Sequence, residues 1–319
     1  MRAIVFKSSM SAIKIAGHDV LHQIWLRILS LQPESAKPLA ILRIGTSCIL
    51  ILQAISVRKY LYPLVGSLGI MQTEITNSLA LSYVPRLEWA ARIGSKVFNL
   101  SEERVIIICF IGYIFFLSVL ALGFYTRFTA LFAWLLHLTF NTSGAASTYG
   151  SYEFSNIALF YCFVMPSGAS LSMDSWLNPN KKSHSLYNAL SRRVLQWHMC
   201  IVYLSSGIEK ATGGQWWNGE AIWRALIRED VPLNFSWLAF VPVVAMIACW
   251  FTLIVEIGYA VFIWIPLTRK LWLVLITLLH AGIAVFLGLW FFSATLLTMN
   301  YSAFYQFKGN LSARVDATC

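Results

Sequence analysis

Seven long apolar runs dominate the sequence and limit what it can fold into more than any other feature. They lie at about 38–57, 104–123, 127–143, 154–171, 190–210, 237–266 and 271–297. A helix that crosses a bilayer needs about 20 mostly apolar residues. Only helices and closed barrels satisfy their backbone hydrogen bonds in lipid, and these runs are too long for barrel strands. The runs therefore predict an all-α fold, a polytopic membrane bundle of about seven to nine transmembrane helices.

The composition agrees with a membrane location. Hydrophobic residues make up 58% of the chain and charged residues 12%, whereas soluble domains carry about 25% charged residues. A soluble domain with so few charges could not cover its surface, so the excess apolar area must face lipid. These proportions exclude a secreted disulfide scaffold, a disordered protein and an ordinary cytosolic enzyme.

The net charge of +10 indicates an orientation in the membrane. Basic residues collect on the cytoplasmic side of membrane spans, where they meet anionic headgroups. With the N-terminus in the cytoplasm, half of the 24 Lys and Arg fall on the shorter set of loops. We therefore expect an integral, multi-pass protein with a cytoplasmic N-terminus, placed in the plasma membrane if the host is bacterial. The lipid bilayer is the expected partner, and nucleic acid is not.

The chain divides into three parts. Residues 1–37 form a cytoplasmic segment, in which the spacing of apolar residues at 18–31 predicts an amphipathic helix on the membrane surface. Residues 38–300 form the transmembrane domain, and residues 301–319 form a short C-terminal tail. Residues 60–71 are a candidate for a further, half-inserted element.

Six titratable side chains interrupt the runs, and each needs a partner because a charge at the centre of a span costs about 2.5–3.5 kcal/mol. They are Arg43, His137, His198, Lys210, Glu256 and His280. A buried hydrogen bond that holds the bundle together explains any one of them as well as a functional site does. The set as a whole favours a cavity. The histidines lie on separate runs without the spacing of metal ligands, so no metal site is expected.

The fifth run carries the clearest polar stripe. At helical spacing, Tyr203, Gly207 and Lys210 fall on one face, and His198 points to roughly the opposite side. We expect Tyr203, Gly207 and, on the third run, His137 to line a cavity that binds a cofactor. Burial disfavours the charged form of an amine, which makes Lys210 the candidate base. The alternative is that Lys210, at the end of its run, reaches into the headgroups.

The sequence around Lys210 resembles a known family. The run Ile201-Val202-Tyr203-Leu204-Ser205-Ser206-Gly207-Ile208-Glu209-Lys210 is followed by Trp217-Asn218-Gly219-Glu220-Ala221. This pattern resembles the vitamin K-dependent gamma-glutamyl carboxylase family and, more broadly, the HTTM (horizontally transferred transmembrane) domain family. Further landmarks agree in order, namely Leu42-Arg43-Ile44-Gly45, Leu122-Gly123-Phe124-Tyr125-Thr126-Arg127, Met165-Pro166-Ser167-Gly168, Glu256, Arg269 and His280. The resemblance covers the whole transmembrane domain, which is therefore HTTM-like.

The resemblance implies gamma-carboxylase-like enzyme chemistry. In that family the lysine at the position of Lys210 is the base that deprotonates vitamin K hydroquinone. The resemblance thus makes Lys210 the candidate catalytic base, with Glu256 and His280 in support. It also implies reduced vitamin K or another quinone as the cofactor, and a peptide or protein as the substrate. Two other hypotheses stay open: a non-catalytic membrane factor for the maturation or export of a secreted peptide, and a small-molecule transporter.

Overall fold

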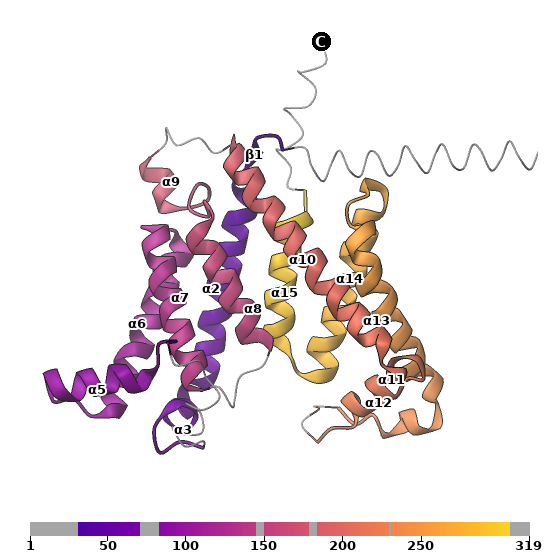
Figure 1. Cartoon of the computed structure of the whole chain (residues 1–319), viewed down its shortest axis with the longest axis horizontal. Coiled ribbons are helices and arrows are strands. Elements are labelled where there is room, and N and C mark those ends of the chain that lie inside the picture. The colour runs from indigo at the N-terminus through magenta and orange to yellow at the C-terminus, as the bar shows by residue number, and fades with distance from the viewer. Residues whose placement is uncertain are drawn as a thin grey trace, which may run out of the picture.

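The computed structural model describes residues 31–70, 83–144, 150–178, 184–229, 231 and 233–306. Within these residues, eight helices of at least 15 residues run between the two ends of the molecule (Figure 1). They are α2 (Lys37–Val57), α6 (Glu102–Leu122), α7 (Thr126–Ser143), α8 (Gly150–Val164), α10 (Leu186–Thr212), α13 (Pro242–Phe262), α14 (Pro266–Leu287) and α15 (Trp290–Phe304). The only sheet in the described part pairs β1 (Glu34–Ser35) with β2 (His184–Ser185) in antiparallel register. The all-α prediction is confirmed.

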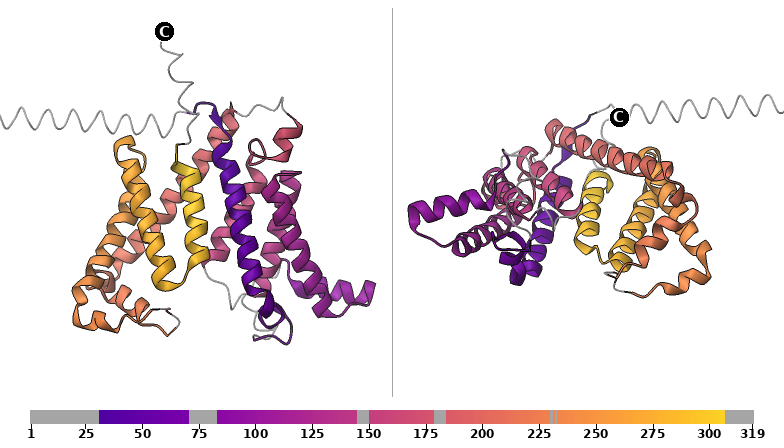
Figure 2. Two further views of the ribbon diagram at one scale, coloured as in Figure 1. Left: turned by 180° about the vertical axis from the view of Figure 1, so that it is seen from behind. Right: turned by 60° about the horizontal axis from the view of Figure 1, so that its bottom comes forward.

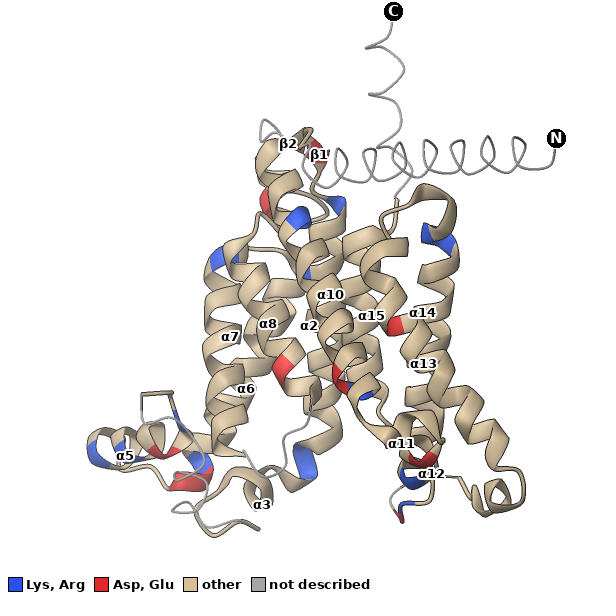
Figure 3. Cartoon of the chain, turned by 45° about the vertical axis from the view of Figure 1, so that its right-hand side comes forward, with Lys and Arg blue, Asp and Glu red and all other residues tan. Residues whose placement is uncertain are grey.

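Four helical segments are long and apolar enough to cross a membrane by length and composition. They are Lys37–Val65, Glu102–Leu122, Pro242–Phe262 and Pro266–Leu287. Their outer faces carry large exposed apolar residues such as Ile111 and Ile254, and most of the charged residues lie towards the two ends of the bundle (Figure 3). An apolar surface of this kind is unfavourable in water, so these helices identify a membrane protein.

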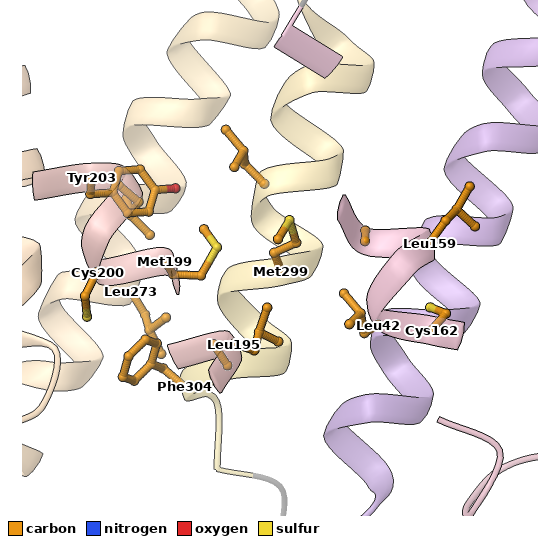
Figure 4. Packing of buried hydrophobic residues seen from close by; sticks show 14 of the residues in the cluster. Leu42, Leu159, Cys162, Leu195, Met199, Cys200, Tyr203, Leu273, Met299 and Phe304 are labelled. Carbon is orange, nitrogen blue, oxygen red and sulfur yellow. The ribbon is translucent and has the colours of Figure 1, made fainter. Parts of the chain in front are cut away.

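The long helices form two groups. The N-terminal group contains α2, α6, α7 and α8, and the C-terminal group contains α10, α13, α14 and α15. Helix α15 also packs against α2 and α8, and so joins the groups (Figure 2). Figure 4 shows the buried core on both sides of this junction, with Leu42 and Leu159 in one group and Met199 and Met299 in the other.

The last apolar run is not one span. The sequence predicted a single helix at 271–297, but α14 ends at Leu287 and α15 begins at Trp290. Gly288 lies between them with φ +70°, a left-handed conformation that glycine adopts without a steric penalty and that commonly ends helices. Because the chain turns back here, α15 returns to the end of the bundle where α2 begins (Figure 1).

Contacts at that end tie α10 to both α15 and β1. Arg192 of α10 donates from Nε to the carbonyl of Ala303 over 2.9 Å and pairs with Glu34 over 3.0 Å. Helix α15 continues to Phe304, past the start of the predicted tail at 301–319, of which residues 307–319 lie outside the described part. The amphipathic helix predicted at 18–31 lies outside it as well, apart from Leu31.

Two more run boundaries differ from the prediction. The fourth run, predicted to 171, leaves the helix after Val164 and turns at Pro166 before the short helix α9 (Met173–Leu177). The sixth run begins with a 3-10 turn, η3 (Ser236–Phe240), before α13. Pro242 lies in the first turn of α13, a position that proline favours, and so marks where this helix begins.

Short elements cover the other end of the bundle. The predicted element at 60–71 is present as η1 (Arg58–Tyr60) and α3 (Leu61–Val65), which continue α2. Helix α5 (Leu87–Phe98) projects sideways from the bundle (Figure 1) and exposes Val97 and Phe98. Helices α11 (Gly214–Trp217) and α12 (Glu220–Leu226) follow α10. An amphipathic helix such as α5, set crosswise to the spans, is typical of the membrane interface.

Candidate functional site

The amine of Lys210 forms an ion pair with Glu256. Lys210 lies in the last turn of α10, and Glu256 lies on α13. Lys210 Nζ lies 2.8 Å from one carboxylate oxygen of Glu256 and 3.1 Å from the other. The side chain of Glu256 is 8% exposed and that of Lys210 is 23% exposed. Lys210 is therefore neither isolated in an apolar pocket nor free among headgroups. It is held inside the bundle and remains accessible from one side.

Two neighbours complete the surroundings of the amine. Lys210 Nζ donates to the hydroxyl of Ser206, one turn earlier on α10. The amine also lies 5.5 Å from the centre of the Trp216 ring, on α11 just after the end of α10. An aromatic face attracts a cation at this distance. Glu256, Ser206 and Trp216 thus surround the amine of Lys210 on three sides.

A buried hydrogen-bond network adjoins the ion pair. The hydroxyl of Tyr203, two turns before Lys210, lies 2.7 Å from His280 Nε2 on α14 and receives a hydrogen bond of 2.7 Å from Asn300 Nδ2 on α15. Tyr259 of α13 donates to Asn300 Oδ1 over 2.5 Å. The ring centres of Tyr203 on α10 and Tyr259 on α13 lie 4.5 Å apart, on the two helices that carry the ion pair. The network thus links all four helices of the C-terminal group.

The network also fixes the proton position on His280. Asn300 Nδ2 donates to Tyr203 and to the carbonyl of Leu296, so the Tyr203 oxygen is already an acceptor. Its own proton then goes to His280 Nε2, because a buried hydroxyl proton without an acceptor is costly. A neutral His280 therefore carries its proton on Nδ1. That nitrogen is buried and has no hydrogen-bond partner among the described residues, which leaves a donor available to a ligand.

Gly207 brings α10 and α13 together at the site. A Cβ atom at this position would lie 2.7 Å from Ile257 Cγ1 and 3.2 Å from Glu256 Cβ. The first distance is too short for a normal contact and the second is tight, so a larger residue here would force α13 to shift. The close contact places the backbone of α13 where Glu256 can reach Lys210. Gly207 therefore serves helix packing beside the site.

The structure brings together four of the residues that the sequence singled out, Tyr203, Lys210, Glu256 and His280. His137 belongs to the N-terminal group, where its partners are Tyr113 of α6 and the carbonyl of Tyr152 of α8. The six residues therefore do not share one cavity, since His137 lies in the N-terminal group and the Lys210 site lies in the C-terminal group.

Two other predicted positions have structural partners. His198 lies on a different side of α10 from Lys210, as the helical spacing indicated, and its Nδ1 lies 2.9 Å from the hydroxyl of Tyr161. Arg43 is fully buried and donates to the carbonyls of Ser167 and Leu171 in the turn after α8.

Asn300 is the residue of the site that the sequence analysis missed. It lies beyond the predicted end of the last span at 297, because the turn at Gly288 was not recognised. An asparagine inside an apolar stretch was the available signal, since polar side chains in membrane helices need a partner on another helix. Trp216 gave no such signal, because tryptophan is common near membrane interfaces.

The side chains of the site include both donors and an acceptor of hydrogen bonds. Lys210 and His280 offer N–H donors, and Glu256 offers an acceptor. A lone carboxylate beside two potential donors suits an acidic hydroxyl better than a metal ion. Within the described residues, no group of three or more His, Cys, Asp or Glu side chains is placed to hold a metal.

Comparison with known proteins agrees with this architecture. The family profile described as HTTM domain matches residues 32–307, which include every helix described above. Neither the curated proteins nor the solved structures contain a match. Since the profile covers most of the 319 residues, the chain belongs to the HTTM domain family of membrane proteins.

Proposed function

We propose that this protein is a membrane enzyme that deprotonates a lipid-soluble hydroquinone at the Lys210–Glu256 pair. The observation that carries the proposal is the Lys210–Glu256 ion pair together with a buried nitrogen of His280 that has no partner among the described residues. The resemblance of the Lys210 region to the vitamin K-dependent carboxylase family supports the same chemistry.

The residues fit a reduced quinone. A hydroquinone hydroxyl has both a proton to give and an oxygen that accepts hydrogen bonds. Glu256 and Lys210 match the first property, and the N–H at Nδ1 of His280 matches the second. The Trp216 ring beside Lys210 adds an aromatic surface of the kind that flat, apolar ligands pack against. When bound, a reduced quinone would supply an acidic hydroxyl and the electrons for an oxidative reaction.

The ion pair accepts the proton in two linked transfers. A proton first moves from Lys210 to Glu256 along their 2.8 Å contact, which leaves a neutral amine and a protonated carboxyl group. A reduced quinone bound beside the pair would supply the hydroxyl proton, and the amine of Lys210 would be its acceptor. The pair would then hold one more proton and one more positive charge.

Two groups would hold the oxygen of a bound hydroquinone. The ammonium of Lys210 would offer a charge-assisted hydrogen bond, and His280 would offer its Nδ1 proton. Tyr203 and Asn300 keep that proton in place, because they occupy Nε2. Tyr203 and Asn300 are thus positioning residues, whereas Lys210, Glu256 and His280 contact the ligand.

The test is the consumption of vitamin K hydroquinone by purified protein in lipid nanodiscs, followed by chromatography of the quinone products. Lys210→Met and Glu256→Gln should each lower turnover by about 100-fold or more, the typical effect of removing a general base. Lys59→Met is the matched control, because Lys59 is exposed in η1 and far along the chain from the site.

Several results would overturn the proposal. One is a wild-type protein that neither binds nor consumes the hydroquinone. Another is Lys210→Met with the same turnover and affinity as Lys59→Met. A protein without turnover that still promotes export of a secreted peptide would support the non-catalytic alternative instead.

A further inference from the structure

The N-terminal helix group contains a pocket that the proposed function does not use. Its volume is about 60 Å³, and it opens partly to the outside. A water molecule needs about 10–15 Å³ on this scale, so the pocket admits more than one water. It accepts part of a ligand, such as a ring or the end of a chain, while the rest of that ligand lies outside.

Five helices contribute to the pocket wall, and four of them supply its apolar residues. Leu50 and Ala54 come from α2, Leu64 from α3, Phe110 from α6 and Phe140 from α7. Helix α3 closes the wall because the chain continues through η1 after α2. A wall of this kind favours the hydrocarbon part of a lipid-soluble molecule.

Gln53 supplies a polar group with no partner. This residue lines the pocket, is 5% exposed, and its Oε1 has no hydrogen bond among the described residues. A buried carbonyl oxygen without a donor is costly, by about 1–3 kcal/mol. Nearly all buried polar atoms in proteins are paired. The amide is therefore a site for a ligand that brings a donor.

Tyr113 supplies a second acceptor in the same wall. His137 Nε2 lies 3.1 Å from the carbonyl of Tyr152, and a carbonyl only accepts, so Nε2 carries a proton. With the ring neutral, Nδ1 accepts the hydroxyl proton of Tyr113 across 2.8 Å. The Tyr113 oxygen then has no proton left to give but retains a lone pair.

We propose that this pocket binds a lipid-soluble alcohol or phenol, with Gln53 and Tyr113 as acceptors for its hydroxyl group. An ether or ketone of the same shape brings no proton to either oxygen. The site therefore distinguishes a hydroxyl from its methylated form. Its helices differ from those that hold Lys210 and Glu256, so the proposal stands apart from the proposed function.

The experiment measures binding of radiolabelled 4-octylphenol and of its methyl ether to the protein in nanodiscs. We expect saturable binding of the phenol and about tenfold weaker binding of the ether, the scale of one hydrogen bond. Gln53→Met should weaken phenol binding about tenfold and leave ether binding unchanged. Gln196→Met is the matched control, since Gln196 donates to the carbonyl of Ala303 in the other helix group.

A second variant, Leu64→Trp, tests the pocket even if Gln53→Met does not fold. Leu64 is half-buried in the short helix α3 at the pocket, so Leu64→Trp should fill the space and abolish binding of both probes while the thermal midpoint stays unchanged. Equal binding of phenol and ether would overturn the proposal. So would no saturable binding by the wild type, or wild-type binding by Leu64→Trp. The proton-transfer proposal at Lys210 is unaffected by any of these results.

Discussion

Arg43 and Lys210 are two cations inside the bundle, and they are held in different ways. Arg43, in the N-terminal group, is fully buried and donates to two backbone carbonyls, of Ser167 at 2.7 Å and of Leu171 at 2.5 Å. Lys210, in the C-terminal group, pairs with the carboxylate of Glu256 and keeps 23% of its side chain exposed. One cation is fixed to the main chain, and the other is paired with a group that can take its proton.

The two cations therefore have different roles: Arg43 serves the structure, and Lys210 serves the proposed reaction. A guanidinium stays protonated in proteins, and its planar fork matches two carbonyls at once. Arg43 therefore fastens the turn after α8 to α2. Gly123 belongs to the same arrangement, because a Cβ there would lie 2.7 Å from Nη1 of Arg43. In the proposed reaction, Lys210 instead passes a proton to the neighbouring carboxylate of Glu256.

The largest expected effect follows from removing Arg43. Arg43→Met removes the donor from the carbonyls of Ser167 and Leu171, and hydrogen bonds to a charged group contribute about 1.5–3 kcal/mol each. The free energy of unfolding should fall by about 3–5 kcal/mol. Thermal unfolding in detergent, followed by loss of the monodisperse peak, measures this. Arg127→Met, at an exposed arginine of α7, is the control, and equal stability of the two variants would contradict a structural role for Arg43.

A smaller effect is expected at Lys210, with a distinctive pattern. Lys210→Met leaves the buried carboxylate of Glu256 unpaired, which should cost about 2–3 kcal/mol given the partial exposure of the pair. Adding Glu256→Gln should restore more than half of that stability, because the uncompensated charge is gone. A double-mutant cycle on thermal or denaturant unfolding measures the coupling. Strictly additive effects would mean that the two side chains do not interact.

The smallest losses of stability are expected when either of the two tyrosine–histidine contacts is removed. Tyr203→Phe removes the partner of both His280 Nε2 and Asn300 Nδ2, and should cost about 2 kcal/mol. Tyr113→Phe removes the partner of His137 Nδ1 alone, and should cost about 1 kcal/mol. Only Tyr203→Phe should also lower hydroquinone turnover, since it frees the His280 proton to move to Nε2. If Tyr113→Phe lost turnover instead, the reaction would take place in the N-terminal helix group, which would contradict the proposal.

Most of the helices could be predicted from the sequence, but the way they pack against each other could not. Apolar runs predicted the bounds of α2, α6 and α7 to within two residues, because burial in lipid demands long uncharged stretches. The turn at Gly288 escaped notice, since glycine is common inside membrane helices and a run on both sides of it looks continuous.

The site was predictable in part for a related reason. Helical spacing placed Tyr203 and Lys210 on one face of α10, and the structure confirms it. That Glu256, 46 residues further along, would meet Lys210 follows from which helices neighbour each other, and no spacing within one helix encodes this. Gln53 was not singled out, because its importance comes from a missing partner that only the packed structure reveals.

Infrared difference spectroscopy of Glu256 tests the proton transfer most directly. Vitamin K hydroquinone is added to the wild type and to Glu256→Gln in nanodiscs, and the carbonyl stretch of a protonated carboxylic acid is followed. The wild type should gain this band on binding, and Glu256→Gln should not. A wild-type spectrum without the band, or the same band in Glu256→Gln, would contradict the account of Lys210 and Glu256 as the proton acceptor.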